Sequence, residues 1–229
     1  FTLDMPTRLP EYIIHAVDAP PEMTGLWNGP AWQHVHPLDI ASFRPEGSSH
    51  HPVTQCKLQH SVEGLSGIFQ VKDRFVRCVN TEFQSEVYLD SCVEIFLQPK
   101  SGAGYFNFEF NCGGALLAYH VIDPGRANGK FKDYVVLSDR VDSQIKRFHT
   151  LSATVNPEVI EPLDWYLEFF IPYSVMESYV GPIDRQATWR GNLFKCGDET
   201  SHPHWGAWSA VDELNFHRPD NFGFLHFSG

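Results

Sequence analysis

The feature that most constrains the fold is a succession of short segments rich in Val, Ile, Phe and Tyr that begins near Gln55. In chain order these segments are "CKLQH", "LSGIFQV", "RFVRCV", "SCVEIFL", "YFNFEFNC", "ALLAYHVI", "DYVVLS", "LSATV", "WYLEFFI" and "FGFLHF". Each has the length and composition of a β-strand, and polar residues separate them. Residues 61–64 indicate a hairpin turn between the first two. The pattern predicts an all-β protein, an antiparallel sandwich or barrel.

The chain before about Thr54 has a different composition. Stretches such as "APPEMTGLWNGPAW" and "RPEGSSHHP" are typical of loops, so we expect an irregular segment over about 1–53, with His50 and His51 solvated. Helical turns are expected only near residues 38–43 and 173–180. Because no repeat or linker divides the 229 residues, a single domain covering 1–229 is expected.

Charge and hydropathy exclude several classes of partner. The net charge of −11, with no basic stripe, argues against nucleic acid. No apolar run is long enough to span a membrane, so we expect a soluble protein without membrane insertion. The compartment stays open, because either a leader preceded Phe1 or Met5 is the native start, which would indicate a cytoplasmic protein. Five cysteines without a CxxC motif leave at least one thiol unpaired within the chain.

One hairpin allows its register to be predicted. In "DSCVEIFLQPKSGAGYFNFEFNC", two alternating strands flank a Pro/Gly turn. If the aliphatic residues face the core, a one-residue slip would place phenylalanines opposite polar positions. The expected inward pairs are Val93 with Phe110, Ile95 with Phe108, and Leu97 with Phe106. The expected outward pairs are Glu94 with Glu109, Cys92 with Asn111, and Phe96 with Asn107. Cys92 and Cys112 then lie on opposite faces, which predicts no disulfide between them.

The outward face of this hairpin combines two acids with two amides. Glu94 and Glu109 are expected about 5 Å apart at Cβ, with Asn107 and Asn111 beside them. Opposed like charges destabilise a sheet unless something compensates them. The face is therefore either a solvated surface, neutralised by Arg74, Arg77 or Lys195, or a ligand cleft lined by carboxylates and amides. The sequence alone does not decide between the solvated surface and the ligand cleft.

The segment "WYLEFFIP" adds one further acid. Trp165, with every second residue after it, is expected in the core. Glu168 lies on the other side of that strand, where it could complete a salt-bridge network or reach the same cleft.

The stretch "GNLFKCGDETSHPHWGAWS", residues 191–209, concentrates chemically versatile side chains in what its Gly and Pro content indicates is a loop. His202 and His204, with Cys196 and Asp198 nearby, could hold zinc or copper. The "HPH" spacing matches no strong metal signature, so hydrogen-bonded structural histidines are the favoured interpretation.

Catalysis and sugar binding are the other possibilities for these residues. Glycoside hydrolysis needs two carboxylates, which Glu94 with Glu109, or Asp198 with Glu199, could supply. No GxSxG, P-loop, HExxH or Rossmann pattern occurs. A sugar binder needs flat aromatic faces and a polar rim, and Trp205 and Trp208 could provide the faces. Alternatively, both tryptophans close one end of the core.

Several motifs in order resemble the family 9-like carbohydrate-binding modules. They are "HPVTQCKLQH", "GIFQVKDRFVR", "DSCVEIFLQP", "GYFNFEFNCGGALL", "WYLEFFIP", "GNLFKCGDETSHPHWGAWS" and "NFHRPDNFGFLHF". The resemblance runs from about Tyr12 to Phe227. It implies a β-sandwich of jelly-roll type without catalytic activity. It also implies binding of plant-type polysaccharides or oligosaccharides in a slot between two tryptophans with a polar rim, structural calcium, and an extracytoplasmic location.

The resemblance can be carried to individual positions. Trp205 or Trp208 fits the C-terminal tryptophan of such a slot. The candidates for the second aromatic are Trp27, Trp32, Phe75 and Tyr88. The expected polar contacts, supported also by the hairpin register, are Glu94, Asn107, Glu109, Asn111, Arg74 and Lys195. No calcium ligands can be assigned.

Related sandwiches bind haem through a Met and a His. The three methionines here are Met5 and Met23 in the irregular segment and Met176 in a helical turn, so no haem is expected. The sequence thus predicts non-catalytic carbohydrate binding. The alternative is a glycoside-active hydrolase or metal-dependent oxidase that uses Glu94 and Glu109, or His202 and His204.

Overall fold

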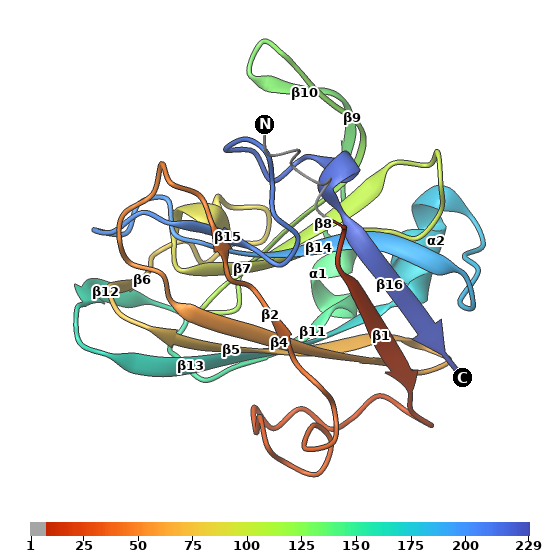
Figure 1. Cartoon of the computed structure of the whole chain (residues 1–229), viewed down its shortest axis with the longest axis horizontal. Coiled ribbons are helices and arrows are strands. Elements are labelled where there is room, and N and C mark those ends of the chain that lie inside the picture. The colour runs from red at the N-terminus through yellow and green to blue at the C-terminus, as the bar shows by residue number, and fades with distance from the viewer. Residues whose placement is uncertain (1–7) are drawn as a thin grey trace, which may run out of the picture.

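The computed structural model describes residues 8–229, which form an all-β sandwich (Figure 1). The described residues include one sheet of fourteen strands, which folds over so that its two halves face each other. In hydrogen-bonding order, the first layer contains β10 (Lys130–Val136), β9 (Leu116–Ala127), β8 (Tyr105–Asn111), β7 (Cys92–Gln98) and β14 (Thr188–Cys196). The path continues through β16 (Gly223–Ser228) and β1 (Glu11–Ala16) to the second layer: β4 (Val53–His60), β5 (Gly64–Asp73), β13 (Leu163–Pro172) and β11 (Lys146–His149). The all-β sandwich predicted from the sequence is therefore confirmed.

Short elements complete the fold. The further strands of the large sheet are β2 (Leu38–Asp39), β3 (Ser42–Phe43) and β15 (Trp205–Ala207), and a separate two-stranded sheet pairs β6 (Val76–Cys78) with β12 (Val155–Val159). The helical elements are α1 (Arg140–Gln144), α2 (Tyr173–Val180) and the 3₁₀ turns η1 (Val87–Leu89) and η2 (Pro219–Asn221). Within residues 8–229, no helix is long and apolar enough to cross a membrane.

The core lies between the two layers, and the hairpin β7–β8 supplies much of its first side. All six predicted cross-strand pairs of this hairpin are present, including Glu94 with Glu109. The inward residues are fully buried: Val93, Ile95, Leu97, Phe106, Phe108 and Phe110. From the opposite layer, Trp165 and Phe169 of β13 are buried in the same core, as alternation predicts. Burying each such side chain stabilises the fold by about 1.5–3 kcal/mol.

The cysteines are free thiols in the structure. Cys92 and Cys112 are not bridged, which confirms the prediction from their opposite faces. Instead, Cys92 lies across from Cys196 of the neighbouring strand β14. Both residues point to the outer side of the first layer.

Two predictions for the N-terminal part were wrong. Residues 11–16 form a true strand, β1, which pairs in parallel with both β16 and β4, whereas the other pairs of the large sheet are antiparallel. Only Tyr12 and Ile14 of this strand are buried, so its apolar pattern is short. Residues 38–43 form the strands β2 and β3 in place of a helical turn. Leu38 and Ile40 are both buried, which is the period of a strand.

Residues 191–209 are not one loop. The first part belongs to β14, which lies between β7 and β16, and β15 follows after a turn. Residues 191–196 are all buried, so polar Asn192 and Lys195 occupy a central strand. Alternation along this strand sends Lys195 to one face of the sheet and Cys196 to the other.

Candidate functional site

A cleft of about 580 Å³ opens on the outer side of the first layer, beside the projecting β9–β10 hairpin. Its floor is formed by outward-pointing side chains of β7, β8 and β14. Its walls come from η1, the β9–β10 hairpin, β15 and residues 214–217. The main lining side chains are Tyr88, Glu94, Asn107, Glu109, Tyr119, Phe131, Tyr134, Cys196, Asp198, Trp205 and Phe216. The cleft thus combines an acidic, hydrogen-bonding floor with aromatic walls.

The floor contains two carboxyl groups and one amide, all deeply buried. Glu94 is 2% exposed, Glu109 is 4% exposed, and Asn107 is fully buried. Asn107 Nδ2 donates a hydrogen bond to Glu109 Oε1 at 2.8 Å, and the Cys196 thiol donates to Glu94 Oε1 at 3.2 Å. Among residues 8–229, Asn107 Oδ1 finds no hydrogen-bond partner. A buried acceptor of this kind costs about 1–3 kcal/mol, which a ligand that donates a hydrogen bond would recover.

Burial changes the acidity of these groups. It raises the pKa of Glu94 well above its usual range, and the adjacent Glu109 carboxyl adds to the rise. It also raises the pKa of Glu109 to about 7, although the hydrogen bond from Asn107 opposes the rise. Burial raises the pKa of Asp198 to about 6, partly offset by a hydrogen bond from Trp205. Near neutral pH the floor can therefore both donate and accept hydrogen bonds.

Two half-buried rings, Tyr88 and Trp205, line the cleft from different elements. Trp205 follows a turn and pairs with Cys196, which brings it back beside the floor. Its indole Nε1 donates to Asp198 Oδ1 at 2.8 Å. Asp198 is also joined to the backbone of Tyr88, because its own backbone N–H donates to the Tyr88 carbonyl at 3.1 Å. This network fixes both aromatic residues relative to the floor.

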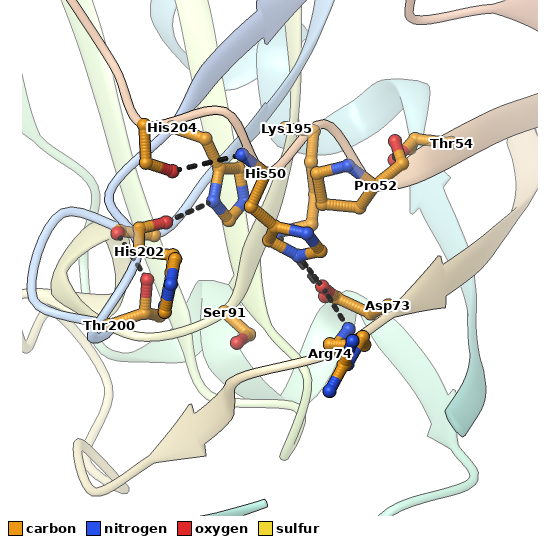
Figure 2. A network of polar contacts seen from close by, with 12 residues as sticks. His50, Pro52, Thr54, Asp73, Arg74, Ser91, Lys195, Thr200, His202 and His204 are labelled. Carbon is orange, nitrogen blue, oxygen red and sulfur yellow. Dashed lines mark hydrogen bonds and ion pairs between the residues drawn. The ribbon is translucent and has the colours of Figure 1, made fainter. Parts of the chain in front are cut away.

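On the other face of β14, a buried ionic network holds the same turn (Figure 2). Lys195 Nζ donates to His204 Nε2 and to the Cys196 carbonyl, each at 2.8 Å, and lies 3.6 Å from Asp73 Oδ2. Asp73 also accepts hydrogen bonds from His50 Nε2 at 2.8 Å and from Trp165 Nε1 at 3.0 Å. Lys195 thus links β14, which carries Cys196, to His204 in the turn that precedes Trp205 of β15.

In this network one positive charge, on Lys195, faces one negative charge, on Asp73. Burial alone would raise the pKa of Asp73, but the Lys195 ammonium and the His50 hydrogen bond outweigh it and hold the pKa below its usual range. Burial and the Lys195 charge lower the pKa of His204 to about 3, so this imidazole is neutral at physiological pH. A neutral ring with Nε2 accepting from lysine and Nδ1 donating to the His202 carbonyl, at 2.8 Å, satisfies both nitrogens.

The contacts of His202 and His204 can be compared with the hypothesis that these two histidines bind zinc or copper. Both His204 nitrogens are used within the protein. His202 stacks on Phe75 with ring centroids 3.6 Å apart, and its Nδ1 lies 2.9 Å from Ser201 Oγ. His50, expected in solvent, is instead tied to Asp73 with 14% of its side chain exposed. The favoured interpretation, structural hydrogen-bonded histidines, agrees with these contacts.

Comparison with known proteins gives the family. A model of carbohydrate-binding family 9 matches residues 32–227. The chain belongs to carbohydrate-binding family 9. A comparison with curated proteins found no match.

Among solved structures, this family 9 chain is similar to a candidate carbohydrate-binding protein from Bacteroides uniformis. The two share 26% identity and a TM-score of 0.79, over 95% of this chain and 99% of the other. It also resembles family 9 modules from Caldicellulosiruptor kristjanssonii, one in complex with glucose and one with cellotriose. Identities are 13% and 12%, TM-scores are 0.62 and 0.63, and each covers 95% of this chain and 96% or 94% of the other. At such identities these two structures show a shared fold.

The family 9 cleft brings together only part of the residues expected at the site. Glu94, Asn107, Glu109 and Trp205 line it, and Tyr88 is the one candidate for the second aromatic that does so. Trp32 is fully buried and donates to Glu168. Glu168 itself accepts backbone hydrogen bonds from residues 24 and 25 and does not line the cleft. Trp27 carries the Lys57 ammonium 4.3 Å above its ring, and Phe75 stacks on His202.

The other four expected contacts lie elsewhere. Asn111 is fully buried, donates to Asp90 Oδ2 at 3.0 Å, and accepts from the Ala115 N–H at 2.9 Å. Arg74 donates to the Ile160 carbonyl at 3.1 Å, at the turn after β5. Trp208 packs against the main core. Lys195 belongs to the network on the opposite face of β14. None of these four lines the cleft.

Some lining residues were not anticipated. Tyr119 could have been found by extending the register, because it pairs with Asn107 across β8 and β9. Asp198 was considered as a catalytic acid and as a neighbour of a possible metal site, but not as a residue lining a sugar cleft. Phe216 stacks on Phe194 from a loop, with centroids 4.0 Å apart, and no local sequence pattern indicates that position.

The family resemblance implies structural calcium, which binds carboxylate and carbonyl oxygens. The one grouping of at least three His, Cys, Asp or Glu ligand atoms found within residues 8–229 is Cys92, Glu94 and Cys196. Calcium requires six to eight oxygen ligands, so a set with two thiols does not fit it.

Proposed function

We propose that the protein binds a neutral poly- or oligosaccharide in this cleft without catalysis. A single observation carries the proposal: buried carboxyl and amide groups form the floor of a cleft walled by aromatic rings. A pyranose has apolar faces that pack on rings and hydroxyl groups that both donate and accept hydrogen bonds. Family membership, and the relatives in complex with glucose and cellotriose, support the same ligand class.

Each polar group of the floor has a role in this proposal. Asn107 Oδ1 accepts a hydrogen bond from a sugar hydroxyl and so gains the partner that it lacks within the described chain. Glu94, whose raised pKa keeps it protonated, donates to a sugar oxygen, and Glu109 accepts. Tyr88 and Trp205 contact the apolar ring faces. The volume of about 580 Å³ lies within the range of about 300–1,000 Å³ usual for small-ligand sites.

The charge of the floor favours neutral sugars. Glu94 and Glu109 lie at the floor and Asp198 lines the cleft beside them, whereas the basic lining residues Arg126 and Lys130 are exposed on the β9–β10 hairpin. A uronic acid carboxylate placed on the floor would be desolvated next to other acids, which is unfavourable. We therefore expect gluco-, xylo- or manno-oligosaccharides to bind better than pectic fragments with free carboxylates.

The enzymatic alternative would use the same carboxyl groups. A glycosidase needs one acid that stays protonated and one carboxylate that stays ionised. Here burial raises the pKa of both Glu94 and Glu109, so neither is firmly ionised near pH 7. This pattern supports hydrogen bonding to a ligand over acid–base catalysis.

The test is calorimetric titration with cello-, xylo-, manno- and pectic oligosaccharides, with native and chemically reduced chain ends. Product formation from each sugar is measured in parallel by chromatography, with and without a chelator. Saturable binding of a neutral sugar without products is the expected result. Sugar turnover that requires Glu94 or Glu109 would instead establish the enzyme, and heat from none of the sugars would refute the proposal for this panel.

A further inference from the structure

Three ligand atoms lie together beneath the cleft on adjacent positions of two strands. Cys92 and Glu94 are two residues apart on β7 and therefore share a face. Cys196 of β14 lies across from Cys92. The two sulfurs and a Glu94 oxygen all lie within 4.8 Å of one another. We propose that Cys92, Glu94 and Cys196 bind a thiophilic divalent cation, for which Zn²⁺ is the natural candidate.

The spacing suits a tetrahedral ion. Zinc binds sulfur at about 2.3 Å and carboxylate oxygen at about 2.0–2.2 Å, which places neighbouring ligand atoms about 3.5 Å apart. The Cys196 sulfur is 3.2 Å from Glu94 Oε1. Small side-chain movements are enough to bring the three atoms around one ion, because all three come from regular strands in a single sheet.

The electrostatic surroundings favour a cation. The carboxyl of Glu109 pairs across β7 and β8 with Glu94, and Asp198 follows two residues after Cys196. Glu94 and Glu109 are almost completely buried and Asp198 is partly buried, and opposed like charges are unfavourable in such surroundings. The Lys195 ammonium is committed on the other face to Asp73 and His204. A bound divalent ion would offset two of the three negative charges that the two thiolates and the Glu94 carboxylate carry as ligands.

The donor set determines the class of metal. Thiolate ligands select zinc, copper(I) and similar ions, whereas magnesium and calcium prefer oxygen. Three protein ligands leave one tetrahedral position, as in zinc sites that also bind an exogenous group. Because Glu94 and Cys196 line the cleft, that position is accessible to a cleft ligand. The metal site stands on its own geometry and does not require that a sugar bind.

The test uses the full chain, reduced with a phosphine and stripped with a chelator that is then removed. Zn²⁺ is titrated against a competing chromophoric chelator, and Co²⁺ is added separately as a spectroscopic probe of thiolate ligation. The expected results are about one bound Zn²⁺ per chain and a thiolate-to-cobalt charge-transfer band. We expect Cys92→Ser and Cys196→Ser each to lower the affinity for Zn²⁺ by at least about 10-fold. Removing a residue that only supports a metal ligand already costs about 10–100-fold, so removing a ligand should cost at least as much.

Two further variants keep the test decisive if a serine variant does not fold. Glu94→Gln retains both thiols and the side-chain shape but should weaken Zn²⁺ binding. The double variant Cys78→Ala/Cys112→Ala removes the other pair of neighbouring thiols and should leave binding and the cobalt band unchanged. The proposal is overturned if the reduced protein binds no Zn²⁺, if no thiolate band forms, or if only the Cys78/Cys112 variant loses the metal. Because the metal titrations contain no sugar, they test the metal site independently of whether the protein binds a sugar.

Discussion

Lys195 and His204 form a buried hydrogen bond in which the lysine ammonium donates to a neutral imidazole, with Nζ and Nε2 2.8 Å apart. The bond fixes the protonation state of the histidine, since a second positive charge there would face the lysine. It also ties β14 to the turn that returns Trp205 to the cleft. The consequences can be measured through pH and through substitution.

His204 should make stability depend on acidity. Its pKa is about 3 in the folded protein and about 6.5 when unfolded, so the unfolded chain binds the proton first as the pH falls. The contribution of His204 is fully present above pH 6.5 and is lost progressively toward pH 3. Between pH 7 and pH 5 the wild type should lose about 2 kcal/mol more than His204→Gln, which keeps an acceptor for Lys195. Urea unfolding at both pH values measures this, and parallel losses in the two proteins would contradict it.

Lys195 should stabilise the fold because its ammonium group pairs with the carboxylate of Asp73, and the side chains of both residues are fully buried. Lys195→Met leaves the Asp73 carboxylate without its ammonium partner, and breaking a buried pair in this way costs about 3–5 kcal/mol. Lys72→Met, on an exposed position of the same strand as Asp73, is the control and should change the free energy of unfolding by less than about 0.5 kcal/mol. Denaturant midpoints test the pair. Equal, small effects would show that the network carries little energy.

Glu109 should have the opposite pH dependence from His204. Its pKa is raised from 4.5 to about 7 in the folded protein, so folding favours the protonated form and stability falls as the pH rises through this window. Glu109→Gln keeps the group neutral. We expect it to be more stable than wild type by about 2–3 kcal/mol at pH 8 and about equal at pH 4. The comparison is made by thermal unfolding in chelator, so that a bound cation does not mask it. A variant that is less stable at pH 8 would refute the assignment.

The fold was predictable where alternation was strict. The β7–β8 hairpin has unbroken aliphatic and phenylalanine positions, so its register followed from the sequence alone. Strand β14 was missed because both of its faces are covered. A central strand buried on both sides shows no alternation, and its Asn192 and Lys195 resemble loop residues. Strand β1 was missed because only Tyr12 and Ile14 mark it as apolar.

The site was predictable only in part for related reasons. Register placed Glu94, Asn107 and Glu109 together, since cross-strand neighbours are fixed once the core face is known. Sequence could not separate Trp205 from Trp208, which lie three residues apart, or identify Tyr88 in η1. Those choices depend on how a turn and a loop return to the sheet, which no local pattern encodes.

The most direct test of the sugar-binding cleft compares two tryptophan-to-alanine variants. Trp205 and Trp27 are both half-buried, but only Trp205 lines the cleft. Calorimetry with the best neutral oligosaccharide is run on the wild type, Trp205→Ala and Trp27→Ala, with folding checked by circular dichroism. We predict that Trp205→Ala loses about 10-fold or more in affinity, as for a central aromatic contact, while Trp27→Ala binds like the wild type. Unchanged binding in folded Trp205→Ala, or an equal loss in both variants, would contradict the account.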